Sequence, residues 1–100
     1  MATQQQGVSI LMPVKNATPF LQRCLQSIVI QQVQWELIIV DDHSTDDSSE
    51  ILTEWATKHA NIRLLKNNGH GIIDALKTAY AHSNHAFVTR MDADDAMPAD

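Results

Sequence analysis

Acidic side chains gather at two places in this 100-residue chain, and both places directly follow an apolar run. The two groups are Asp41 and Asp42, and Asp92, Asp94 and Asp95. Carboxylates this close together repel one another unless a cation lies among them. Hard oxygen ligands of this kind suit Mg²⁺ or Mn²⁺, especially where substrate phosphates complete the shell. The pattern therefore predicts a site for a divalent cation and a nucleoside diphosphate.

Each acidic group also has a simpler explanation. Residues 92–95 could be an acidic loop that caps a helix, since an Asp-x-Asp pattern alone is common. Asp41 and Asp42 could accept hydrogen bonds from a ribose hydroxyl or a base N–H, or they could cap the helix that follows them. The occurrence of both groups at strand ends favours a binding site.

Apolar periodicity places these residues in a simple order of elements. We expect strands at 8–14, 35–40, 61–65 and 85–91, the last one buried, and helices after Thr18, after Ser44 or Asp46, and over 72–80. Thr18 is the expected N-cap of the first helix, followed by Pro19. The expected apolar face of the third helix is Ile72, Ile73, Leu76, Ala79 and Tyr80.

The alternation of strands and helices predicts a Rossmann-like α/β fold, βαβαβαβ, with a parallel sheet that helices cover on both faces. Ligands of such sheets bind beyond the carboxyl ends of the strands, which is where both acidic groups lie. The loop 67–71 holds two glycines, but the chain has neither a dinucleotide-binding glycine fingerprint nor a P-loop.

Composition excludes several classes of protein. The net charge is -5, from 12 acidic and 7 basic residues. No Lys/Arg cluster exists to neutralise nucleic-acid phosphates, so we expect no nucleic-acid partner. Cys24 is the only cysteine, which fits a reducing cytoplasm. The sequence shows no signal peptide, and no stretch approaches the ~20 apolar residues of a membrane helix.

Five segments, all in order, resemble family 2 glycosyltransferases, the inverting enzymes of GT-A type. They are VSILMPVKN at 8–16, LQRCLQSI at 21–28, LIIVDDHSTD at 37–46, GIIDALK at 71–77, and RMDADD at 90–95 with Pro98 after it. Together they span residues 8 to 98. Three positions depart from the family pattern: His43 and Ala79 stand at usual glycines, and Lys77 stands at a usual Asn. We expect Lys77 to face solvent.

The resemblance implies a set of donor contacts. The implied nucleotide-binding residues are Pro13, Val14, Asn16, Asp41, Asp42, Asp92 and Asp94. Among them, Pro13 and Val14 would lie beside the base, and Asp41 would bind the base or the ribose. The implied ligands of the cation, Mg²⁺ or Mn²⁺, are Asp92, Asp94 and Asp95. The implied reaction transfers a sugar from a nucleoside-diphosphate donor, expected to be UDP-linked, to a glycan or lipid-linked acceptor with inversion.

Family members carry a second half that binds the acceptor and supplies the general base, an Asp or Glu. We therefore expect residues 1–7 to be a flexible N-terminus and 8–100 to be the donor-binding half of a longer enzyme, inactive alone. The expected location is the cytoplasm, including the inner face of a membrane. Such a half would leave a sheet edge and apolar faces open near Met12, Val14 and the strand that ends at Met91, so we expect self-association.

Two other functions fit parts of the pattern. A metal-dependent phosphoryl-transfer enzyme also uses Asp at strand ends, but it needs an Asp nucleophile with a nearby Lys, Ser or Thr in a set spacing, which we do not find. A non-catalytic nucleotide-binding or assembly module would explain a chain that lacks the acceptor half.

Overall fold

The computed structural model describes residues 7–93, and within them the elements follow the predicted order. The strands are β1 (Val8–Val14), β2 (Trp35–Asp41), β3 (Ile62–Lys66) and β4 (Phe87–Arg90), and the helices are α1 (Thr18–Val29), α2 (Ser48–Lys58) and α3 (Gly71–Ala81). Every pairing between these strands is parallel, and the sheet order is β3-β2-β1-β4. The predicted Rossmann-like α/β fold is thus confirmed. Of the predicted flexible N-terminus, residues 1–6 lie outside the described residues.

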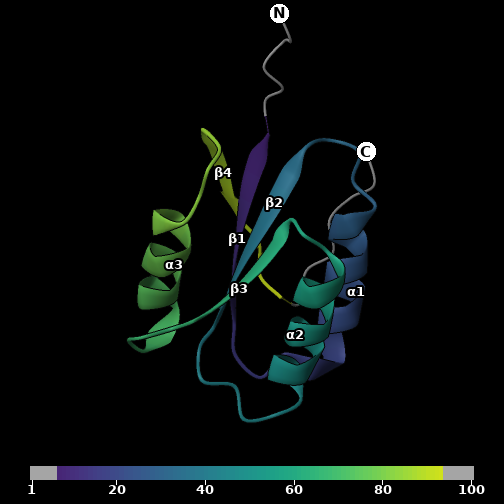
Figure 1. Cartoon of the computed structure of the whole chain (residues 1–100). Coiled ribbons are helices and arrows are strands. Elements are labelled where there is room, and N and C mark those ends of the chain that lie inside the picture. The colour runs from purple at the N-terminus through teal and green to yellow at the C-terminus, as the bar shows by residue number, and fades with distance from the viewer. Residues whose placement is uncertain (1–6, 94–100) are drawn as a thin grey trace, which may run out of the picture.

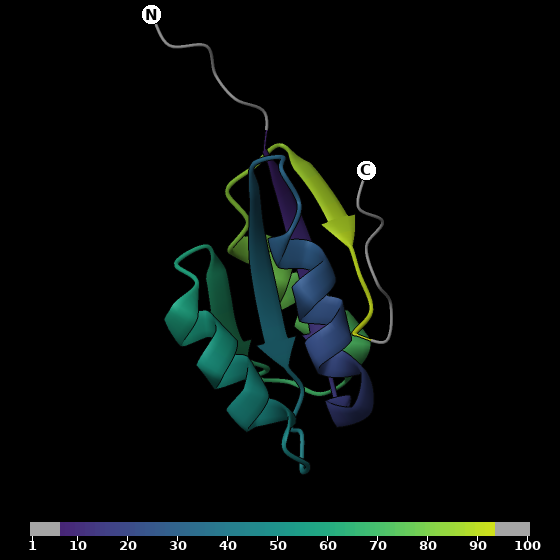
Figure 2. The ribbon, with the colours of Figure 1, turned by 90° about the vertical axis from the view of Figure 1, so that its right-hand side faces the viewer.

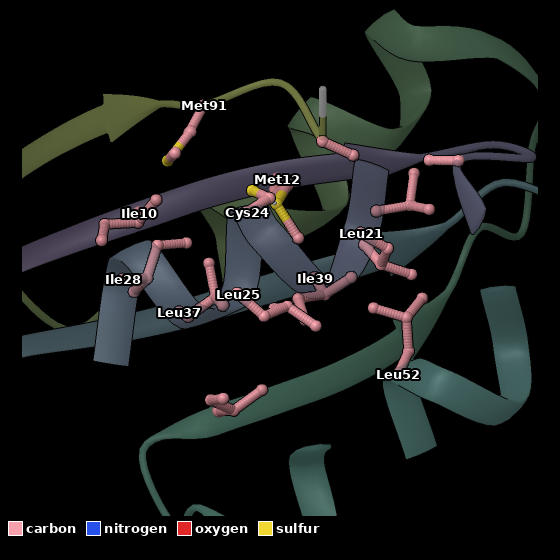
Figure 3. Packing of buried hydrophobic residues seen from close by; sticks show 14 of the residues in the cluster. Ile10, Met12, Leu21, Cys24, Leu25, Ile28, Leu37, Ile39, Leu52 and Met91 are labelled. Atoms are coloured by element: carbon pink, nitrogen blue, oxygen red, sulfur yellow. Dashed lines mark hydrogen bonds between the residues drawn. The ribbon is translucent and has the colours of Figure 1, made fainter. Parts of the chain in front are cut away.

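The helices cover the two faces of the sheet unequally. α1 and α2 lie on one face, and α3 covers the other (Figure 1 and Figure 2). The larger core lies under α1 and α2, where α1 presents an apolar stripe at helical spacing to the strands (Figure 3). The stripe consists of Leu21, Cys24, Leu25 and Ile28, all fully buried. Against α3 the core is smaller, and it joins Leu11, Ile38 and Val40 of the strands to Ala75 and Ala79.

The predicted apolar face of α3 is wrong in most of its members. Ile73 and Tyr80 are each 63% exposed, and the buried residues of the helix are Ala75 and Ala79, of which only Ala79 was in the predicted set. Alanine has no side chain beyond Cβ, so the helix lies close to the sheet on this face. Leu76 of the predicted set packs partly against the same core, while Ile72, Ile73 and Tyr80 are exposed.

The prediction that the fourth strand is buried is also wrong. All residues of β4 are exposed, including Phe87 at 59% and Val88 at 38%. Within the described part of the chain, β4 is an edge strand that pairs with β1 alone. The expected open surface is therefore right for the strand that leads to Met91, which is exposed, and wrong for Met12 and Val14, which are 0% and 1% exposed. The open apolar surface is the α3–β4 face, a hollow lined by Leu11, Ile73, Leu76, Lys77, Tyr80, Val88, Thr89 and Arg90.

The N-cap prediction for α1 is corrected as well. Thr18 is the first helical residue, Ala17 precedes it as the N-cap, and no capping bond comes from the Ala17 side chain. The first residue of α2 and the loop just before it supply the missing acceptors: the Ala17 N–H donates to Ser48 Oγ at 2.9 Å, and the Thr18 N–H donates to Asp46 Oδ2 at 3.3 Å. The two helix starts are therefore joined directly.

Glu36 lies buried at the amino edge of the sheet, the edge opposite the acidic strand ends. Its Oε2 accepts hydrogen bonds from the Ser9 hydroxyl at 2.5 Å and from the Asn84 backbone N–H at 2.6 Å, and its Oε1 accepts one from Asn84 Nδ2 at 2.9 Å. The Ser9 hydroxyl in turn accepts from the His85 N–H. This network joins β1 and β2 to the loop that leads into β4, so it sets where the edge strand begins.

Replacing Glu36 with Gln should lower the free energy of unfolding by about 1–3 kcal/mol at pH 7, because one of the donors now facing the carboxylate would lose its acceptor. Urea denaturation measures this difference. Glu54→Gln is the matched control, since Glu54 is exposed and its ion pair within residues 7–93 is the one with Lys58, and we expect a change within about 0.5 kcal/mol there. Equal stability of the Glu36→Gln variant and the wild type would contradict the structural role of this network.

The same variant should show how stability depends on pH. Burial by itself raises the pKa of Glu36, but hydrogen bonds from Ser9 and Asn84 outweigh it and bring that pKa below its ordinary value of 4.5. Stability from a carboxylate with a lowered pKa is present above the ordinary value and is lost as the pH falls through the folded-state pKa. Wild type and Glu36→Gln should therefore differ most near neutral pH and converge in acid.

Candidate functional site at the carboxyl edge

The parallel register brings the carboxyl ends of the strands into one line. Val14 of β1 lies opposite Asp41 of β2, and Asp41 lies opposite Lys66 of β3. The Met91 N–H donates to the Leu11 carbonyl at 3.0 Å, so the segment after β4 continues beside the second half of β1. The predicted site residues that lie along this edge are Pro13, Val14, Asn16, Asp41, Asp42 and Asp92. Asp94 and Asp95 lie outside the described residues.

Asp41 accepts hydrogen bonds from the β2–α2 loop and from the start of α2. Its Oδ1 accepts from the Ser44 N–H at 3.2 Å, and its Oδ2 accepts from the Ser49 hydroxyl at 2.5 Å. The side chain is 7% exposed and contributes to a small hollow that His43, Ser44, Ser49 and Lys66 complete. Both oxygens of Asp41 thus hold the β2–α2 loop and the start of α2 in place. Of the two roles considered for Asp41 from the sequence, these bonds correspond to the one at the start of the following helix.

Asp42 accepts hydrogen bonds on the opposite face of the sheet, from residues next to the start of α3. Its Oδ1 accepts from Asn67 Nδ2 at 3.0 Å, and its Oδ2 accepts from the Gly71 N–H at 3.1 Å. Gly71 has a φ of +90°, a conformation that glycine adopts without strain, and this conformation occurs at the first residue of α3. Because a carboxylate offers about four lone-pair sites, these two bonds fix Asp42 and leave capacity for a further donor.

A hollow of about 330 Å³ opens beside Asp42. Its lining residues come from the ends of β1 and β2 and from the start of α3: Pro13, Val14, Lys15, Asp42, Gly71 and Ile72. Pro13 and Ile72 supply apolar surface, Asp42 supplies a fixed acceptor, and Lys15 supplies a cation. A second, smaller hollow shares Pro13 and Lys15 and is completed by Asn16, Ala17, Phe20 and Ala93.

Three residues that line the larger hollow were not predicted from the sequence: Lys15, Gly71 and Ile72. The two glycines of the loop at 67–71 are the signal in the sequence that could have pointed to this part of the hollow.

Asn16 organises the loop after β2. Its Oδ1 accepts from the Thr45 N–H at 2.7 Å and the Asp46 N–H at 3.3 Å, and its own N–H donates to Ser44 Oγ. Hydrogen bonds from Ser48, and to a lesser extent from Thr18, hold the pKa of Asp46 well below its usual range against a smaller opposing effect of desolvation. Asp46 therefore stays ionised where the helix starts meet.

His43 adopts a φ of +57°, which fits the resemblance to a family that usually has glycine at this position. Its Nε2 lies 2.9 Å from the Gly69 carbonyl oxygen, and its ring stacks on that of His70 with centroids 4.6 Å apart. The loops after β2 and β3 are thus joined on their outer side as well as through Asp42. Lys77 is exposed, as predicted, and lies on the α3–β4 face.

Asp92 forms an ion pair with Arg90, whose Nε and Nη2 lie 3.1 Å and 2.9 Å from Asp92 Oδ1. The charge of this carboxylate is therefore partly balanced. Among the described residues, no group of three or more His, Cys, Asp or Glu side chains is arranged to hold a metal ion. The predicted cation ligands consist of Asp92 together with two residues outside the described range.

Comparison with known proteins places the chain in a family. The model of the family described as "Glycosyl transferase family 2" matches residues 9–100. The chain is 33% identical over 94 residues to a chondroitin synthase of Escherichia coli, and the match covers 93% of this chain and 14% of that protein. It is 32% identical over 89 residues to the uncharacterized glycosyltransferase EpsJ of Bacillus subtilis (strain 168), with coverage of 88% and 26%. The chain thus spans about a quarter or less of the length of these relatives.

Solved structures share the fold. The mannosyltransferase PcManGT from Pyrobaculum calidifontis, in complex with GDP-Man and Mn²⁺, superposes with a TM-score of 0.86 at 29% identity, over 97% of this chain and 30% of that one. TarS 1–349 of S. aureus in complex with UDP superposes with a TM-score of 0.81 at 24% identity, over 91% of this chain and 28% of that one. The family match covers nearly the whole sequence, and the fold agrees with it, so the chain belongs to glycosyl transferase family 2.

Proposed function

We propose that this chain is the donor-binding part of a glycosyltransferase and that it binds a nucleoside-diphosphate sugar at the carboxyl edge of its sheet. The hollow beside Asp42 carries the proposal, because it combines a fixed acceptor, apolar surface and a cation where ligands of parallel sheets bind. The 29% identical PcManGT was solved with GDP-Man and Mn²⁺, which supports a donor of this class.

In this proposal, the base lies in the hollow, next to Pro13, Val14 and Ile72. Asp42 accepts a hydrogen bond from the base, since its carboxylate borders the hollow and is held by two donors. Asp41 and Asn16, which the resemblance had suggested as nucleotide contacts, act by holding the loops that frame the site. UDP remains the donor nucleotide suggested by the resemblance, and GDP is the second candidate because of PcManGT.

The proposed cation, Mg²⁺ or Mn²⁺, would be held by Asp92, Asp94 and Asp95. Asp92 fits this role in part: its Oδ1 pairs with Arg90, while its Oδ2 takes no hydrogen bond among the described residues. Carboxylate oxygens are the ligands that these ions prefer. A bound cation would neutralise the charge that develops on the departing nucleoside diphosphate.

The rest of the reaction is proposed from the family resemblance. Transfer with inversion to a glycan or lipid-linked acceptor needs a general base, and we assign it to an Asp or Glu beyond residue 100 of the full-length protein. The proposed location is the cytoplasm or the inner face of a membrane. Among the described residues, no helix has both the length and the apolar character needed to cross a bilayer.

Calorimetric titration should show that UDP or GDP binds this chain and that Mn²⁺ strengthens the binding. Asp94→Ala and Asp95→Ala should each reduce that metal-dependent gain about tenfold or more, because each removes a charged ligand. Glu54→Ala, which removes an exposed carboxylate on α2, should leave it unchanged.

Failure of both nucleotides to bind, with and without Mn²⁺, would contradict the proposed function and would favour a non-catalytic assembly module. Equal loss in Asp94→Ala, Asp95→Ala and Glu54→Ala would show that overall negative charge, and not a specific ligand set, attracts the cation.

We further propose that the isolated chain self-associates through its α3–β4 face, where exposed apolar residues adjoin an edge strand. Val88→Lys or Tyr80→Lys should shift the sedimentation profile toward the monomer by placing like charges in the contact. Val33→Lys is the control, because Val33 is 61% exposed but lies outside this face. A wild-type chain that stays monomeric at high concentration would contradict the proposal.

A further inference from the structure

Two histidines meet across the loops on either side of the proposed donor hollow. The His43 ring comes from the loop after β2, and the His70 ring comes from the loop that leads into α3. The rings stack with centroids 4.6 Å apart and planes 19° apart. His43 Nε2 lies 2.9 Å from the Gly69 carbonyl oxygen, which accepts a hydrogen bond when that nitrogen carries the proton. We call this stack and this hydrogen bond the histidine clasp.

Each ring of the clasp belongs to a residue that neighbours the hollow in sequence. His43 follows Asp42, and His70 precedes Gly71, and both of these neighbours line the hollow. The Gly71 N–H donates to Asp42 Oδ2 at 3.1 Å, so the same two loops are joined at the hollow and, through the clasp, on their outer side. Separation of the two rings would therefore weaken the bond between Gly71 and Asp42.

The loop that carries His70 is held from its own side. The Gly69 N–H donates to Asn67 Oδ1 at 3.2 Å, and the His70 N–H donates to Asp74 Oδ2 at 3.2 Å. Gly69 also lies so close to α3 that a Cβ placed on it would collide with the Asp74 carboxylate. The loop thus presents a fixed carbonyl and a fixed ring to His43, which reaches them from a φ of +57°.

Charged groups at the ends of β2 and β3 and in the first turn of α3 lie next to the clasp: Asp41, Asp42, Lys66 and Asp74. The three carboxylates outnumber the one ammonium, so they balance a single imidazolium in the pair. A second imidazolium would lie 4.6 Å from the first, and like charges at this separation repel. The pair therefore stacks when at most one ring is charged and separates when both are.

We propose that His43 and His70 are positioning residues that hold the two sides of the donor hollow together, and that acid weakens donor binding by charging both rings. This inference rests on the proposed function of the hollow. It goes beyond that function, because it makes donor affinity depend on pH through His43, which stands where the family usually has glycine. Histidine changes its charge between about pH 5 and 8, so the clasp is present above that range and is lost as the pH falls through it.

Titration with GDP-mannose and with UDP-N-acetylglucosamine at about pH 7.5 and about pH 5.5 tests the inference. These ligands were found with PcManGT and TarS, and their esterified phosphates take up no proton in this range. Wild type should bind its preferred ligand about three- to tenfold less tightly at the lower pH. His82→Gln should show the same loss, because His82 lies at the far end of α3 from the hollow.

Variants of the clasp should remove this dependence on pH. His43→Gly keeps the positive φ without strain, and it should bind about threefold less tightly than wild type at about pH 7.5, with little further loss in acid. His70→Ala should have a similar effect. His70→Phe restores a ring that carries no charge, so it should recover part of the affinity that His70→Ala loses and keep it in acid. Both histidines are exposed, so these variants should fold.

Amide exchange measures the clasp without any ligand. At one pH, near 7.5, the Gly71 N–H should exchange about threefold faster in His43→Gly than in wild type, because its bond to Asp42 opens more often. Unchanged exchange together with unchanged donor affinity in His43→Gly would overturn the positioning role.

The remaining outcomes separate the clasp from the donor site. An equal loss in acid for wild type, His43→Gly and His70→Phe would show that other groups cause the dependence on pH, and this would overturn the role of the clasp. Equal wild-type affinity at both pH values would do the same. Absence of binding of either ligand at either pH would overturn the proposed function, while exchange at Gly71 would still report on the clasp.

Discussion

The parallel register of β1, β2 and β3 is the constraint on which the rest of the site depends. It sets Val14, Asp41 and Lys66 opposite one another, so that the loops after these strands leave the sheet along a single edge. Loops from distant parts of the sequence can then bond to one another. The Asn16 side chain contacts Thr45, and the Asp42 side chain contacts Gly71. These side chains are short, so they can bridge the loops only because the strands end side by side.

Side-chain alternation along β2 explains why two neighbouring carboxylates have different partners. Successive side chains of a strand point to opposite faces of the sheet. At the end of β2, Asp41 bonds to Ser49 of α2 on one side, while Asp42 bonds to Asn67 and Gly71 beside α3 on the other. One carboxylate therefore holds the start of a helix, and its neighbour borders the hollow proposed for the donor.

Much of the fold was predictable from the sequence because local patterns control it. The apolar run before Asp41 and the helical spacing of Leu21, Cys24, Leu25 and Ile28 identify their elements without any tertiary knowledge. Burial in α3 and β4 was not predictable in the same way, since it depends on which face of the helix meets the sheet and on which strand forms the edge. Ala75 packs against the sheet while Ile73 is exposed, a choice that hydrophobicity alone predicts in the opposite sense.

The site itself was predictable in its location and less so in its composition. Asp41, Asp42 and Pro13 lie at the edge where the strand-end argument expects them, but Lys15, Gly71 and Ile72 enter the hollow through tertiary packing. Glu36 had a visible signal, a lone charge inside an apolar strand, yet its partners Ser9 and Asn84 lie 27 and 48 residues away. Single-sequence patterns do not reveal contacts over such separations.

Chemical-shift mapping tests the central claim most directly, because it locates a bound nucleotide on the folded chain without any substitution. On titration with UDP or GDP in the presence of Mg²⁺, the backbone amides of Lys15, Asp42 and Gly71 should show the largest shifts, since these residues line the hollow at the carboxyl edge. Shifts confined to the α3–β4 face, or none above those caused by salt alone, would contradict the assignment of this edge as the donor site.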